Sequence, residues 1–96
     1  MFINNMKKKD IPIYIQRRYS DIENKFLNLV DKVDFTEFED EDDFHSFVVH
    51  ELSDMLSVDL DSYNFIYEYL DDMMINPVKK VWKNRKKITR QKWNIL

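Results

Sequence analysis

The fold is decided by residues 15–33, which read IQRRYSDIENKFLNLVDKV. Apolar side chains recur there at alternating intervals of four and three residues, which places them on one face of an α-helix. These side chains are Ile15, Tyr19, Ile22, Phe26, Leu29 and Val33, with Val30 beside them. The spacing predicts a first helix near residues 12–33.

Two different N-terminal signals leave the start of this helix open. Asp10 and Pro12 favour an early start, because a helix tolerates proline in its first turn. Ser20 and Glu23 have the spacing of a capping box, which favours a late start and would leave residues 11–17 extended.

Two more helices are predicted near residues 42–56 and 62–75. The apolar set of the earlier helix is Phe44, Phe47, Val48, Leu52, Met55 and Leu56, and that of the later helix is Tyr63, Phe65, Ile66, Tyr69, Leu70 and Met73. Asp61 or Ser62 is expected to cap the later helix. We expect an antiparallel hairpin packed on the first helix. A DNA-reading motif is disfavoured, because Glu68, Asp71 and Asp72 would repel phosphate groups.

Charge divides the chain at Pro77. Residues 1–76 hold seven Lys or Arg and 18 Asp or Glu, a balance of -11, whereas residues 77–96 hold eight basic residues and no acidic one. The predicted fold is all-α, a small helical bundle of three helices plus a basic amphipathic C-terminal helix. Residues 1–76 form the acidic body, and residues 77–96, beginning at Pro77, form the basic helix packed on it.

The two faces of the C-terminal helix differ in character. One face gathers Val78, Val81, Trp82, Ile88, Thr89, Ile95 and Leu96, with Trp93 at its margin, and the other carries Lys79, Lys80, Lys83, Lys86, Lys87 and Arg90. Three interpretations compete: docking on the acidic body through Trp82 and its aliphatic neighbours, binding of nucleic acid through the lysines with tryptophan stacking, and binding to an anionic membrane or a partner's groove. Docking is favoured, because the chain itself supplies an acidic surface.

Missing residue types exclude several classes of function. The chain contains no glycine, alanine or cysteine. Phosphate-binding glycine loops and EF-hand turns need glycine, while disulfides and zinc-thiolate sites need cysteine. The N-terminus has no long apolar stretch, so we expect neither a signal peptide nor a membrane span, and a cytoplasmic location. The composition is also typical of proteins from AT-rich genomes, such as those of many bacteriophages and some bacteria, and a phage protein would act in the cytoplasm of its host.

Catalytic patterns are sparse. His45 and His50 are five positions apart, which turns them about 140° from each other on a helix, so they are not expected to share a metal. His45 shares a face with Glu41 and Asp42, where a side-chain hydrogen bond is the ordinary outcome. Glu51 is of greater interest, because it projects into an apolar arc and a partly buried carboxylate is a candidate functional group.

The tetrapeptide Glu51-Leu52-Ser53-Asp54 resembles the Glu-x-x-Asp half of the magnesium site in all-helical nucleotide pyrophosphohydrolases of the MazG type. The resemblance covers four residues and implies a magnesium-dependent hydrolase. That family also needs an upstream acidic helix motif, whose spacing the acids at 37–41 do not match. We therefore predict no enzyme, no metal and no cofactor. Glu51 is instead expected to pair with a Lys, Arg or Tyr side chain at a helix contact.

A dense acidic run offers a different function. The acidic surface is defined by Glu37, Glu39, Asp40, Glu41, Asp42 and Asp43. These residues are predicted to form a loop and the first turn of a helix, where carboxylates favour the helix dipole. We predict a small binding or regulatory protein that meets a protein partner through this surface, through the basic helix, or through both. A nucleic-acid-binding accessory protein is the alternative, and a homodimer through the 15–33 stripe is a further expectation.

Overall fold

The computed structural model describes residues 7–86. Its elements in chain order are η2 (Lys8–Asp10), α1 (Ile11–Arg17), α2 (Tyr19–Lys32), η3 (Phe35–Glu37), α3 (Glu41–Leu56), α4 (Leu60–Met73) and α5 (Ile75–Lys83), where η marks a 3-10 helix. Residues 7–86 contain no strand, so the predicted all-α class is confirmed. The predicted count of three helices plus one is wrong for this range, because the first helix is divided in two.

The first predicted helix starts early and bends at Arg18. Residues 11–17 are helical, with Pro12 in the first turn of α1, so the late start at Ser20 is wrong. The Arg18 N–H bonds to the carbonyls of both Tyr14 and Ile15, a tighter turn that separates α1 from α2. The bend lets α1 contact α4 while α2 contacts α3, which one straight helix would not allow.

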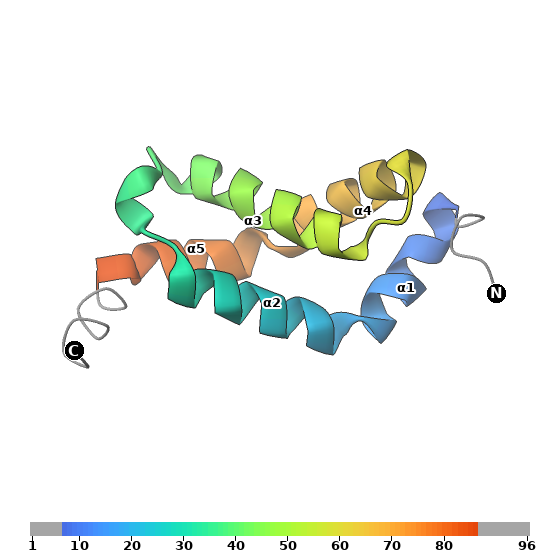
Figure 1. The fold of residues 1–96 in the computed structure, drawn as a ribbon, viewed down its shortest axis with the longest axis horizontal. Coiled ribbons are helices and arrows are strands. Elements are labelled where there is room, and N and C mark those ends of the chain that lie inside the picture. Colours follow the sequence, from blue (N-terminus) through green and yellow to red (C-terminus); the bar gives the residue numbers. More distant parts are fainter. Residues whose placement is uncertain (1–6, 87–96) are drawn as a thin grey trace.

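The centre of the fold is the antiparallel hairpin of α3 and α4. Figure 1 shows α2 along one side of α3 and α4 along another, and α3 contacts both helices. Asp59 caps α4 by accepting from the Ser62 N–H at 2.7 Å, so the prediction of Asp61 or Ser62 as the cap is wrong. Ser62 is the third residue of α4, and its hydroxyl oxygen accepts hydrogen bonds from the N–H groups of Val58 and Asp59. Both serine contacts fix the turn between the helices.

The basic segment begins two residues earlier than predicted. Helix α5 starts at Ile75, and Pro77 is its third residue instead of its first. Proline lacks an N–H, so it cannot continue the hydrogen-bond ladder of α4, yet it fits the first turn of a new helix. The chain therefore bends at Met74, and α5 runs back beside α3 toward the end of the molecule that holds η3 (Figure 1).

The core lies on α3, which contacts α2, α4 and α5. Phe44, Val48, Val49 and Leu52 are fully buried, and Ile22, Phe26, Ile66 and Leu70 pack around them. The stripe of the first predicted helix thus packs on its own hairpin. Three residues assigned to buried arcs are exposed instead, because they fall at the edges of those arcs: Tyr19, Met55 and Tyr69.

No helix in residues 7–86 combines the length and the apolar character needed to cross a membrane.

Candidate functional site

The acidic surface lies at the start of α3, and part of it has a local structural role. The Asp40 side chain accepts from the Asp43 N–H at 2.9 Å, which caps the helix. The Asp43 carboxylate in turn accepts from the Glu39 N–H at 3.1 Å. These two bonds satisfy N–H groups at the helix entrance that have no partner within the helix. The predicted loop and helix start are therefore present, and the carboxylates of Asp40 and Asp43 stabilise the backbone there.

Asp34 has a similar role at the start of η3. Its carboxylate accepts from the Thr36 hydroxyl at 2.6 Å and from the Thr36 N–H at 3.0 Å, which caps η3. These two hydrogen bonds hold the pKa of Asp34 below its ordinary value of 3.8. The bond from the Thr36 hydroxyl has the larger effect, and the bond from the Thr36 N–H adds to it. Asp34 was not among the predicted site residues, although it begins the same acidic run.

Four of the six residues of the acidic surface line two open grooves. The aromatic groove is lined by Lys32, Val33, Asp34, Glu37, Phe38, Asp43, Ser46, Phe47, His50 and Tyr67. The histidine groove is lined by Glu41, Asp42, His45, Ser46, Asp71, Ile75 and Lys79. Glu37 and Asp43 therefore serve the first groove and Glu41 and Asp42 the second, a division that linear sequence does not reveal.

In the histidine groove, His45 pairs with a different acid from the one expected. Its Nε2 lies 2.9 Å from a carboxylate oxygen of Asp71 on α4, and its side chain is only 16% exposed. The expected bond to Glu41 or Asp42 is replaced because the hairpin brings α4 across the face on which His45 lies. The contact ties α3 to α4.

The described part of the basic segment docks on the body through apolar contacts. Val78 is fully buried, and the Trp82 ring stacks on Phe44 with a centroid distance of 5.7 Å. Phe35 meets the same indole edge-on at 6.4 Å. The Arg85 guanidinium lies 4.2 Å from the centre of the indole ring and donates to the Trp82 carbonyl. Trp82 is thus partly buried and held against the body by groups of the protein itself.

The lysines of the same segment remain at the surface. Lys79, Lys80, Lys83 and Lys86 are exposed, and none of them forms an ion pair with another described residue. Val78 and Trp82 make the contact, as the docking interpretation expects, whereas the complementary charge that favours docking forms no ion pair among the described residues. Three predicted site residues, Lys87, Arg90 and Trp93, lie outside the described residues.

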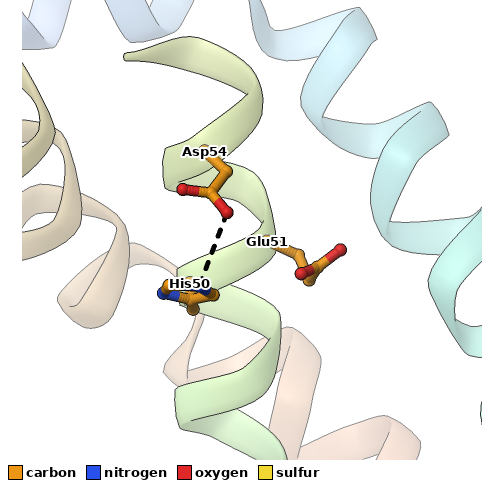
Figure 2. Close-up of side chains that lie close together, drawn as sticks. All are labelled: His50, Glu51 and Asp54. Atoms are coloured by element: carbon orange, nitrogen blue, oxygen red, sulfur yellow. Dashed lines mark ion pairs between the residues drawn. The ribbon is translucent and has the colours of Figure 1, made fainter. Parts of the chain in front are cut away.

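A third cluster joins His50, Glu51 and Asp54 on α3 (Figure 2). The His50 Nε2 lies 3.4 Å from the Asp54 carboxylate, while its Nδ1 lies 2.6 Å from the Tyr63 hydroxyl. Burial, followed by Asp54 and Tyr67, raises the pKa of Tyr63, which keeps its hydroxyl protonated. One carboxylate oxygen of Glu51 lies within 4.8 Å of ligand atoms of the other two residues, but the side chain projects away from the His50–Asp54 pair.

Glu51 instead meets a cation from a neighbouring helix. Lys25 on α2 lies 3.9 Å from its carboxylate, with both side chains about one-third exposed at 32% and 34%. Glu51 therefore pairs with Lys25 at a helix contact, as predicted from the sequence. Glu51 and Asp54 project from α3 in different directions in Figure 2, although one carboxylate oxygen of each lies within 4.8 Å of the other.

No protein-family model, curated protein or solved structure matches this chain.

Proposed function

We propose that this protein is a non-enzymatic binding protein that captures a basic protein partner through its acidic surface. One observation carries the proposal. Among residues 7–86, none of the six carboxylates of the acidic surface forms an ion pair with a lysine or arginine. Six like charges within seven residues repel one another, and a cationic partner relieves that repulsion.

The arrangement of α5 also supports this function. Val78 and Trp82 make the docking contact, and among residues 7–86 no lysine of α5 forms an ion pair with the acidic surface, although Lys79 lines the histidine groove beside Glu41 and Asp42. An acidic surface without such ion pairs accelerates the approach of a basic partner, and it makes association sensitive to salt. The amino-acid composition is typical of AT-rich genomes and favours a bacteriophage origin, so the partner is sought in the bacterial cytoplasm.

Two variants with equal net charge test the proposal. The surface variant carries Glu37→Gln, Glu39→Gln, Glu41→Gln and Asp42→Asn, which spares the capping residues. The control variant carries four neutralised exposed acids elsewhere: Asp21→Asn, Glu23→Gln, Asp31→Asn and Asp72→Asn. Each protein is immobilised and exposed to bacterial extract at low and at high salt.

The expected result is a basic protein retained by the wild type and the control variant, lost from the surface variant and released by salt. Equal retention by all three proteins would show that the acidic surface does not select the partner. Circular dichroism verifies that both variants keep their helices. Every substituted side chain is exposed except that of Glu41, which is partly exposed, so little loss of structure is expected.

Nucleic acid binding through α5 is the second candidate. Its support is the row of exposed lysines without ion pairs in the described part of the chain, namely Lys79, Lys80, Lys83 and Lys86. Packing of Trp82 against Phe44 argues against base stacking on that ring. Lys79→Gln with Lys83→Gln should then reduce DNA or RNA binding at low salt. Binding that these substitutions leave unchanged would exclude this candidate.

A further inference from the structure

The aromatic groove combines aromatic side chains with negative charge. Phe38, Phe47 and Tyr67 line it and are partly buried, each packed against the core. The Phe38 and Phe47 rings lie 5.3 Å apart between centroids at an angle of 49°. Because the rings are partly buried and the neighbouring acids are exposed, the groove has an apolar base with charge at its edge.

Three carboxylates stand at that edge, from Asp34, Glu37 and Asp43. Asp34 remains ionised at neutral pH, since its bonds to Thr36 lower its pKa. The bonds of Asp34 and Asp43 to backbone N–H groups fix the positions of two of these carboxylates. Lys32 is the one lysine in the lining, so the groove is negative overall.

Two other grooves of the described structure lack this combination. The histidine groove has three carboxylates but no Phe, Tyr or Trp in its lining. The groove between α2 and the end of α3 contains one aromatic side chain, Tyr14. Its two cations, Arg18 and Lys25, outweigh its one carboxylate, Asp21. A ligand with both a flat apolar face and a positive charge therefore fits the aromatic groove best.

We propose that the aromatic groove binds an arginine side chain of the basic partner, an inference that rests on the proposed function. A guanidinium is planar and weakly hydrated, so it stacks on aromatic rings while its N–H groups bond to carboxylates. A lysine ammonium is compact and strongly hydrated, which makes it a poorer match for a groove with this base. Arginine in a basic segment thus provides the contact that charge alone does not.

Two blocked peptides, one alternating arginine with glycine and the other lysine with glycine, serve as probes for the full-length protein. The arginine peptide should bind at least about threefold more tightly, which is the range expected for an exposed cation–π contact. Chemical shifts in an isotope-labelled sample should move at Phe38, Phe47 and Tyr67. Phe47→Leu and Glu37→Gln should each weaken arginine-peptide binding about threefold.

Matched variants outside the groove make the test specific. Tyr69→Leu removes an exposed ring from α4, and Glu41→Gln removes a carboxylate from the histidine groove, so neither should reduce the preference for arginine. Lys32→Gln should tighten binding, because it removes the lysine that repels the probe. Thermal unfolding identifies any variant that loses its fold, and Glu37→Gln, an exposed change, keeps the test valid if Phe47→Leu destabilises the protein.

Two failures have different meanings. Equal affinities for the two peptides, with Glu37→Gln and Glu41→Gln weakening both alike, would overturn the arginine site and leave the acidic surface as the binding surface. No binding of either peptide at low salt would overturn the arginine site and the proposed function together.

Discussion

The acidic run of residues 34–43 and helix α5 are both densely charged, yet the protein uses their charges differently. Asp34 bonds to a backbone N–H group of η3, and Asp40 and Asp43 bond to backbone N–H groups at the start of α3. The lysines of α5 point outward, without ion pairs to other residues in 7–86, while Val78 and Trp82 hold the helix in place. Opposite charge in two neighbouring segments therefore does not mean that they neutralise each other.

This difference follows from the cost of ordering long side chains in water. An exposed ion pair contributes little, because screening and lost side-chain entropy offset its attraction. A short Asp side chain beside an unbonded N–H loses less freedom and satisfies a group that the helix leaves open. The chain thus uses short acids to shape its turns and an aromatic contact to join its two charged regions.

The largest effect is expected where the two regions meet. Phe44→Ala should lower the free energy of unfolding by about 3–5 kcal/mol, because it removes a fully buried ring that contacts Phe35, Phe38 and Trp82. Trp82→Ala should cost less, about 2–3 kcal/mol, since Trp82 is only partly buried. Urea unfolding measures both. Losses below about 1 kcal/mol would mean that the aromatic contact does not join α5 to the body.

An intermediate effect is expected for the acids that act as caps. Asp40→Ala should reduce stability by about 1 kcal/mol, because it removes the acceptor for the Asp43 N–H. Glu39→Ala is the matched control, since only its backbone N–H takes part in the capping bonds described. Urea unfolding of the two variants should separate them. Equal losses would mean that general charge, and not hydrogen bonding, determines stability at this helix start.

A smaller, pH-dependent effect is expected at Asp34. Its pKa is lower in the folded protein than its ordinary value of 3.8, so its stabilising contribution is present above that value and is lost as the pH falls through the folded pKa. Thr36→Val should raise the pKa of Asp34 toward 3.8, because the hydroxyl bond is the largest cause of the shift. Carboxyl carbon shifts followed by NMR measure this change. A pKa that stays low in the variant would contradict this assignment.

The smallest effect is expected for the lysines of α5. Lys79→Gln with Lys83→Gln should change stability by no more than about 0.5 kcal/mol, because both side chains are exposed and no ion pair holds them in the described structure. Thermal unfolding at low salt gives the most sensitive test. A large loss there would show that charge attraction contributes to docking and would remove the contrast between the two regions.

Much of the fold could be predicted from the sequence because hydrophobic periodicity is local information. The stripe through Ile22, Phe26 and Leu29 and the arc through Phe44 and Leu52 identified helices that the structure contains. The bend at Arg18 could not be predicted in this way, since the same stripe fits a straight helix. It depends on α1 and α2 having different partners, which is a property of the assembled fold.

The candidate site was predicted only in part. The acidic run is visible as composition, and its division between two grooves appears only when α4 lies across α3. Phe38 and Tyr67, which line the aromatic groove, are far apart in sequence and gave no joint signal. Asp59 was missed as the cap of α4, although Asp is among the favoured N-cap residues, because Asp61 and Ser62 nearby are favoured too.

The most direct test of the account is whether salt releases α5 from the body. Trp93→Phe leaves Trp82 as the one tryptophan, and its emission and its quenching by acrylamide are measured at low and at high salt. The account predicts blue-shifted, protected emission at both, because packing on Phe35 and Phe44 does not depend on charge. Red-shifted, accessible emission at high salt would contradict it. Ion pairs would then hold α5, and the protein's own basic helix would cover the acidic surface.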